Sequence, residues 1–250
     1  MAVFAWGMVL LAGSGGAIGA IDAKSWIFLI LSGLATGASW ICYFRALQLG
    51  DVNKVAPIDK SSTVLTMLLA FLLLGEPLHG NMLLGMALIL AGTLLMLQRQ
   101  EHAAAPSKKG VSWLLWAIAS AVFASLTAIL GKIGIQGVES NLGTAIRTLV
   151  VLVMAWGIVL AQGKQREIGS IDRKSWLFLV LSGLATGASW MFYYRALQDG
   201  QASIVAPIDK LSILVTILFS RLILHEKLSR RALAGLALLT AGTLLLLVKR

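Results

Sequence analysis

Ionisable residues in otherwise apolar surroundings are the side chains of this sequence most able to do chemistry. Two groups of them recur at an offset of 150 residues: Arg45, Asp59 and Lys60, then Arg195, Asp209 and Lys210. Arg45 and Asp59 lie about six residues before and after the turn at 50–53. At a rise of about 1.5 Å per residue, both fall roughly 10 Å below that turn in an antiparallel helical hairpin. Each arginine can therefore meet its aspartate.

Each group carries a net charge of +1, which favours anionic or zwitterionic solutes over cations. One interpretation is a polar cavity with two related binding clusters, since ionisable side chains in an apolar environment are costly and mark functional sites. The alternative is an Arg–Asp pair that only locks the hairpin, while Lys60 extends to the polar surface. Both interpretations stay open.

Aromatic residues and one further arginine accompany these groups. Each pair of aromatics, Trp40 with Tyr43 and Trp190 with Tyr193, lies just before its arginine and either stacks on a solute or packs between helices. Arg147 has no counterpart in the first group. Its side chain either faces a substrate or extends from a helix end to the interface. We include all five among the candidate substrate-binding residues.

No constellation in the sequence suggests catalysis, a metal or a cofactor. Cys42 is the single cysteine, and the three histidines, His79, His102 and His225, lack metal-site spacing. No nucleophile–base pair is visible. We therefore expect a protein that is not an enzyme.

The composition indicates what must position these residues. Hydrophobic residues make up 58% of the 250, charged residues 13%, and mean hydropathy is +0.86. A water-soluble domain could not cover its surface with so few charges, so we expect an all-α polytopic membrane protein with the lipid bilayer as a partner. The net charge of +10 is scattered over short loops rather than gathered in a basic stripe, so we expect no nucleic-acid binding.

Apolar stretches of nearly membrane-spanning length predict about nine transmembrane helices. They run over residues 2–18, 26–48, 54–74, 81–98, 112–133, 143–162, 176–198, 204–224 and 231–248. Within them, the glycine pairs Gly33/Gly37 and Gly183/Gly187 favour close helix packing. Pro57 and Pro207 either occupy the first turn of a helix or lie deeper and free carbonyls at a cavity. Glu76 and Glu226 close their spans, and Glu226, beside Lys227, is either an interfacial charge or a gating group.

The chain is internally duplicated. Residues 1–100 align without a gap on residues 151–250, with about 55 identical positions. We expect a first unit of four helices at 1–100, a linker at 101–110 and a complete unit of five helices at 111–250. Five helices per unit place the two copies in opposite orientations, so this is an inverted repeat whose first copy lacks its first helix.

The repeated Gly-Ala-Ser-Trp and Tyr-x-Arg-Ala-Leu runs, the Ala-Pro-Ile-Asp-Lys helix start and the Gly85-x6-Gly92 helix resemble the EamA family of the drug/metabolite transporter superfamily. The resemblance implies a ten-helix inverted repeat around a central cavity, lined by the third and fourth helices of each unit. It also matches Arg147 to an arginine that the superfamily often shows in that helix.

The resemblance leads us to expect a secondary transporter that exports a small polar or amphipathic metabolite or drug by alternating access. A flippase-like protein and a non-transporting membrane subunit are the alternatives. The expected location is the bacterial plasma (inner) membrane, the expected partner a small-molecule substrate, and a homodimer is a further option.

Overall fold

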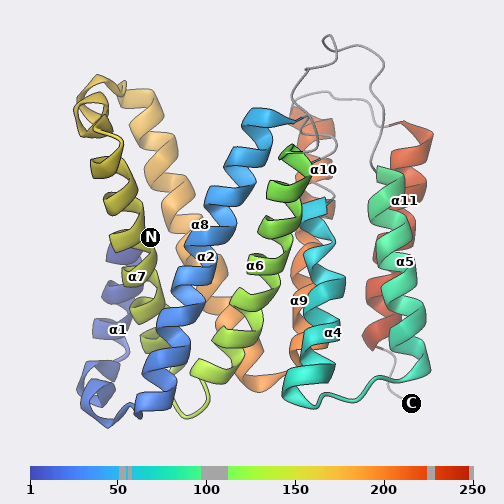
Figure 1. Cartoon of the computed structure of the whole chain (residues 1–250), viewed down its shortest axis with the longest axis horizontal. Coiled ribbons are helices and arrows are strands. Elements are labelled where there is room, and N and C mark those ends of the chain that lie inside the picture. The colour runs from blue at the N-terminus through green and yellow to red at the C-terminus, as the bar shows by residue number, and fades with distance from the viewer. Residues whose placement is uncertain (51–54, 56–57, 97–111, 224–228, 248–250) are drawn as a thin grey trace. The chain divides into compact units, whose positions relative to one another are not determined.

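The computed structural model is all-helical over the residues that it describes, which are 1–50, 55, 58–96, 112–223 and 229–247 (Figure 1). The helices are α1 (Ala2–Leu11), η1 (Ser14–Ala20), α2 (Ala23–Leu49), α4 (Ser62–Leu74), α5 (Gly80–Met96), α6 (Ser112–Gly134), α7 (Ser140–Ala161), η2 (Lys164–Ser170), α8 (Arg173–Asp199), α9 (Ala202–Lys210), α10 (Ser212–Ile223) and α11 (Arg230–Leu247). The predicted linker at 101–110 lies outside the described residues.

Five of these helices, α2, α6, α7, α8 and α11, are long and apolar enough to cross a membrane. The bent pair of α1 and η1 would make a sixth, and α5 is apolar but shorter. The prediction of nine continuous spans is therefore not confirmed. The predicted span 2–18 bends by 97° because Gly13 takes a left-handed conformation with φ 65°, which ends α1. The predicted span 204–224 is divided at Leu211 into α9 and α10.

Helix boundaries recur at the offset of the sequence repeat. Helices α2 and α8 are both 27 residues long and begin 150 residues apart, as do η1 and η2. Gly13 and Gly163 precede the latter pair with φ values of 65° and 67°. Similar local sequences therefore form the same local structures in both copies.

The chain divides into two compact units, which do not coincide with the two sequence copies. Unit 1 comprises Met1–Gly37 and Leu130–Gly200, and unit 2 comprises Ala38–Ile129 and Gln201–Arg250. Each unit thus contains residues of both copies, and α2 and α6 contribute to both units.

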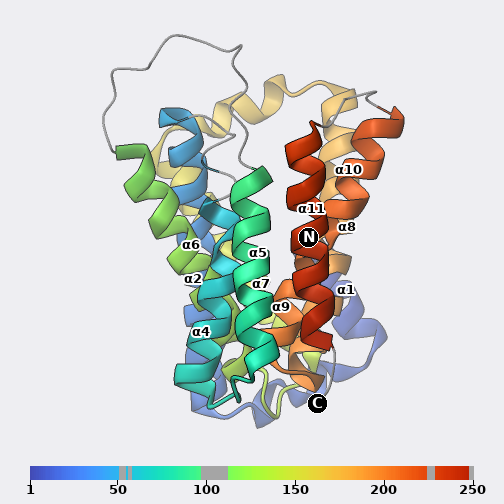
Figure 2. The same cartoon turned by 90° about the vertical axis from the view of Figure 1, so that its right-hand side faces the viewer.

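In unit 2, α5 and α11 form a close pair (Figure 2). A Cβ on Gly85 would lie 3.0 Å from the Gly242 carbonyl oxygen, and one on Gly92 would lie 2.5 Å from that of Gly235. Glycine therefore permits the backbones to approach here. Because Gly85 faces Gly242 and Gly92 faces Gly235, α5 and α11 run antiparallel.

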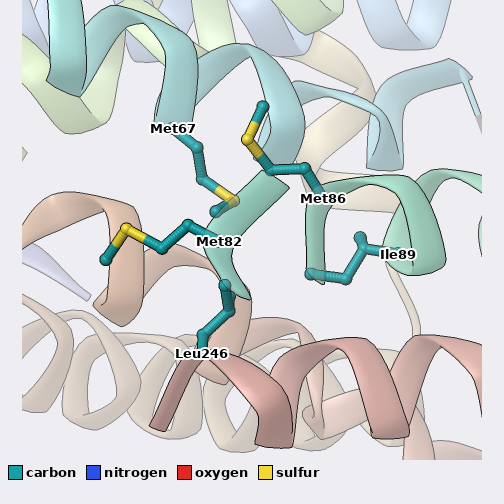
Figure 3. Packing of buried hydrophobic residues seen from close by; sticks show 5 residues of the cluster. All are labelled: Met67, Met82, Met86, Ile89 and Leu246. Carbon is teal, nitrogen blue, oxygen red and sulfur yellow. The ribbon is translucent and has the colours of Figure 1, made fainter. Parts of the chain in front are cut away.

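A buried cluster joins α4 to the same helix pair (Figure 3). It consists of Met67, Met82, Met86, Ile89 and Leu246. Unbranched methionine side chains fill irregular spaces between helices. The cluster fixes one face of α4 against α5 and α11.

Unit 1 uses the predicted glycine pairs for packing. A Cβ on Gly33 of α2 would lie 2.8 Å from Cβ of Val150 in α7, and one on Gly37 would meet the Met154 side chain. A Cβ on Gly187 of α8 would lie 2.8 Å from the ring of Phe4 in α1. The prediction that these glycines serve helix packing is confirmed.

Candidate functional site

The most unusual side chain of unit 1 is Arg147, which is 0% exposed although it lies within the candidate membrane span α7. The Glu139 side chain caps the start of this helix by accepting hydrogen bonds from the backbone N–H groups of Asn141 and Leu142. Thr144 and Thr148 are buried around Arg147 and donate to carbonyl oxygens of their own helix. The predicted alternative of a side chain extending to the interface is wrong, since Arg147 points into the protein.

Two aromatic rings of α8 and one hydroxyl of α2 surround the guanidinium group. Its Cζ lies 4.0 Å from the ring centroid of Trp190 and 4.5 Å from that of Tyr194. Such cation–π contacts stabilise by about 0.5–2 kcal/mol each. Nη1 donates a hydrogen bond of 2.6 Å to Thr36 Oγ1. We call Arg147, Trp190, Tyr194 and Thr36 the arginine cage.

Hydrogen bonds hold the cage together. Thr36 Oγ1 donates to the Ser32 carbonyl oxygen at 2.8 Å, and the hydroxyls of Ser32 and Tyr194 lie 3.0 Å apart. Tyr193 packs edge-on against both Trp190 and Tyr194. The aromatic residues of the cage therefore form one block with α2.

The end of α8 is fixed by side chains that bind backbone carbonyls. Lys132 of α6 donates to the carbonyl oxygens of Leu197 and Gly200, and Gln198 donates to those of Ile135 and Val138. A cation at a helix C-terminus interacts favourably with the helix dipole. These bonds position the helix turn that bears Tyr194.

The positive charge of Arg147 has no counter-ion among the described residues, because neither of the ion pairs found there involves it. Its Nε also lacks a hydrogen-bond partner. An uncompensated charge in a low-dielectric interior costs several kcal/mol. The cage is therefore poised to interact with a negative charge.

Unit 2 contains a second polar centre. Ser120 of α6 donates to Asp59 Oδ1 at 2.8 Å, and Ser39 of α2 donates to the Ser120 carbonyl oxygen at 3.1 Å. Tyr43 lies within electrostatic range of Asp59. Asp59 is thus bound to α6, and Ser39 links the same serine to α2.

The predicted pairing of Arg45 with Asp59 is wrong. Arg45 is exposed and donates to Gln48 Oε1 at 3.1 Å on its own helix, while Asp59 binds Ser120. The spacing argument placed both residues at the same depth but could not decide which way each side chain turns. With Arg45 turned away, the net charge of +1 assigned to this group does not hold for Asp59 and Lys60.

The second group separates similarly. Arg195 pairs with Asp199 at 2.9 Å on the exposed face of α8, and Asp209 pairs with its neighbour Lys210 at 3.4 Å. Lys60 is exposed and lies within electrostatic range of Asp59, Asp209 and Lys210. The Asp-Lys pairs of both copies therefore gather in unit 2 with a balanced charge.

The aromatic candidates also differ between the copies. Trp40 is 41% exposed, and half-buried Tyr43 packs beside the apolar cluster of Ala46, Val55 and Ala117. Trp190 and Tyr193, in contrast, belong to the block around Arg147.

Sequence reasoning missed several residues of these sites: Ser32, Thr36, Tyr194 and the exact role of Glu76. The sequence did contain a signal for Tyr194, because the equivalent residue of the first copy is Phe44, so that only the second copy has a hydroxyl at this position. Glu76 accepts hydrogen bonds of 2.7 and 2.9 Å from the backbone N–H groups of Ala202 and Ser203. Glu76 is buried and caps the start of α9. Glu226 lies outside the described residues.

Pro207 lies inside α9 as the sixth residue of the helix, so the first-turn interpretation is wrong for it. Pro57 lies outside the described residues. In the part of the chain that the structure describes, no three His, Cys, Asp or Glu side chains gather into a metal site.

Comparisons with known proteins place this geometry in context. The sequence profile of the EamA-like transporter family matches residues 1–98 and 111–248. An uncharacterized transporter in the cobO 3′ region of a Sinorhizobium species is 49% identical over 137 residues, which are 55% of this chain and 97% of that protein. An uncharacterized transporter of Methanothermobacter thermautotrophicus is 26% identical over 231 residues, covering 88% of this chain and 64% of that protein.

One protein of known crystal structure aligns over the whole of this chain and 85% of its own, with a TM-score of 0.78 and 20% identity. At this identity the likeness shows the fold alone.

Proposed function

The chain belongs to the EamA-like transporter family, and we propose that it is a secondary transporter that exports a small polar or amphipathic metabolite or drug. Its family and its apolar helices make it an integral membrane protein of the drug/metabolite transporter superfamily. We place it in the bacterial plasma membrane. Members of this family are transporters, so we assign it no enzymatic activity.

The observation that carries the proposal is the buried Arg147, a charge with no counter-ion among the described residues. Ionisable residues inside membrane spans mark substrate or ion pathways, because their burial is otherwise too costly. Arg147 with Trp190 and Tyr193 is the first proposed substrate contact. The other proposed contacts are Arg45, Asp59, Lys60, Arg195, Asp209, Lys210, Trp40 and Tyr43.

Alternating access is supported by matched helix interruptions. Ser61 and Leu211, 150 residues apart, each follow an Asp-Lys pair and donate backbone hydrogen bonds to the carbonyls three residues earlier. Interrupted helices near a binding site are typical of transporters that rock one repeat against the other. In this mechanism the protein flexes at the two interruptions. One lies between α9 and α10, and the other lies between residues 58–60 and α4.

A flippase-like activity is the second candidate, favoured by an apolar cavity in unit 2. The cavity has a volume of about 290 Å³ and is lined by Ile58, Ser61, Val64, Leu65, Leu68, Leu90, Ile118, Ala121 and Val122. Leu68, Ile118 and Val122 are more than a third exposed, and Asp59 and Ser120 are sequence neighbours of lining residues. A partly exposed apolar cavity suits the apolar tail of an amphipathic substrate.

The test is an untargeted mass-spectrometric comparison of metabolites exported by cells that overproduce the wild type, Arg147→Gln or Arg166→Gln. Arg166 lies exposed in η2 and serves as the matched arginine control. We expect export to fall at least about tenfold for Arg147→Gln at equal membrane abundance, and to be unchanged for Arg166→Gln. Normal export by Arg147→Gln would show that the proposed site is wrong.

A further inference from the structure

Arg147 has donors and a charge that its neighbours do not satisfy. Nη1 binds the neutral hydroxyl of Thr36, while Nε has no hydrogen-bond partner. The rings of Trp190 and Tyr194 attract the cation through their faces but carry no lone pair in the guanidinium plane that could accept its N–H groups. The cage therefore stabilises the cation in part and leaves Nε without an acceptor.

A carboxylate is the group that would complete this arrangement. The guanidinium plane presents N–H donors in a fixed fork that matches two carboxylate oxygens. A carboxylate on the Nε side would satisfy the free donor and neutralise the charge.

We propose that Arg147 binds the carboxylate of a monoanionic organic substrate, with Trp190, Tyr193 and Tyr194 as the wall beside it. This inference rests on the proposed transport function and names its substrate class.

The charge balance selects a monoanion. Arg147 supplies one positive charge, and Lys132, the basic residue of α6 in the same unit, is occupied by the carbonyls of Leu197 and Gly200. A phosphate monoester carries about −1.5 to −2 at neutral pH and would bring excess negative charge into the interior. A carboxylic acid with one negative charge leaves the site neutral.

Access to the site requires movement within unit 1. Arg147 is 0% exposed, so side chains that enclose it must move before a solute reaches Nε. The rings of Trp190 and Tyr194 both belong to α8 and contact Tyr193, so displacement of this one helix would open the cage. The structure thus corresponds to a closed state, in which Arg147 is enclosed within the protein.

Purified protein in detergent provides a direct test with defined probes. Benzoate is a flat monocarboxylate, and benzamide has nearly the same shape without the charge. We expect benzoate, and not benzamide, to raise the thermal unfolding midpoint in a saturable way. The shift should vanish in Arg147→Gln and persist in Arg166→Gln. Equal shifts from benzoate and benzamide, or a full benzoate shift in Arg147→Gln, would overturn the proposal.

A second measurement needs no variant, so it decides the question even if Arg147→Gln does not fold. Photoactivated 4-azidobenzoate should label the α8 peptide that contains Trp190, Tyr193 and Tyr194, and benzoate but not benzamide should compete. Labelling that is confined to other peptides would contradict the proposed site.

The export comparison separates this inference from the transport function. If the wild type exports a solute without a carboxylate and does so independently of Arg147, the inference fails while transport stands. If benzoate binds through Arg147 but no metabolite is exported, the site stands and the transport proposal fails.

Discussion

Helices α2 and α8 contain the same ten-residue run, Leu-Ser-Gly-Leu-Ala-Thr-Gly-Ala-Ser-Trp, yet their surroundings differ. Leu29 of α2 is 0% exposed, whereas its counterpart Leu179 of α8 is 54% exposed. Ser39 is buried against Ser120, whereas Ser189 is exposed. Trp190 contacts the buried Arg147, whereas its counterpart Trp40 is 41% exposed.

The difference shows that the identical run does not specify one environment. Residues of α6 cover α2, with Ser120 against Ser39 in unit 2 and Gly134 against Leu29 in unit 1. Helix α8 instead presents its aromatic turn to α7. Duplicated segments have thus diverged through their partners, with α2 serving packing and α8 contributing the candidate binding wall.

The strongest contrast is expected for the leucine pair. Leu29→Ala should destabilise the protein by about 2 kcal/mol, which is near the low end for buried leucines. The loss is at the low end because lipid is as apolar as leucine, so that mainly the packing against Gly134 is lost. Leu179→Ala should change stability by less than about 0.5 kcal/mol. Thermal unfolding of both purified variants measures the contrast, and equal losses would mean that the two faces are equally packed.

A smaller contrast is expected where the copies differ in one hydroxyl. Tyr194→Phe removes the hydrogen bond with Ser32 and should cost about 1 kcal/mol. The reverse change Phe44→Tyr, at a position that is 60% exposed, should be nearly neutral. Thermal unfolding measures both variants. If Tyr194→Phe is as stable as the wild type, the Tyr194 hydroxyl does not stabilise the arginine cage.

The smallest contrast concerns the helix starts and appears only in acid. Hydrogen bonding to Ser175 lowers the pKa of Asp172, which caps α8, and hydrogen bonding to Ser25 lowers that of Asp22 before α2. A carboxyl with a depressed folded-state pKa stabilises the fold above its unfolded pKa of about 3.9 and loses this contribution as pH falls through the folded value.

The effect should be larger for Asp172, whose bond to the Ser175 N–H is 3.0 Å against 3.4 Å for Asp22 and Ser25. Unfolding midpoints between pH 5 and pH 2 should therefore become less pH-dependent in Asp172→Asn than in Asp22→Asn, because asparagine still caps but does not titrate. A larger change in Asp22→Asn would reverse the expected order.

Much of the fold could be predicted because its signals are local. Apolar length located α2, α6, α7, α8 and α11, and the spacing of Gly33 and Gly37 predicted a close helix contact. The interruptions were missed, since the left-handed φ of Gly13 and the break at Leu211 each concern one backbone position within a predicted span. The orientation of the copies in the membrane stays a prediction.

The candidate sites were predicted only in part. The sequence indicated that Arg147 and Trp190 could bind a solute, but it could not bring them together, because they lie on different helices. It also paired Arg45 with Asp59 from depth alone, whereas rotation of each side chain about its helix axis decided the outcome.

The sequence by itself determined the family resemblance, the duplication and the apolar helices, because these follow from residue order and composition. Tertiary structure alone decided that Arg147 is enclosed by Trp190, Tyr194 and Thr36, and that Glu76 caps α9. The physical reason is that a buried charge finds its partners across helices, in contacts that depend on how the helices rotate and pack.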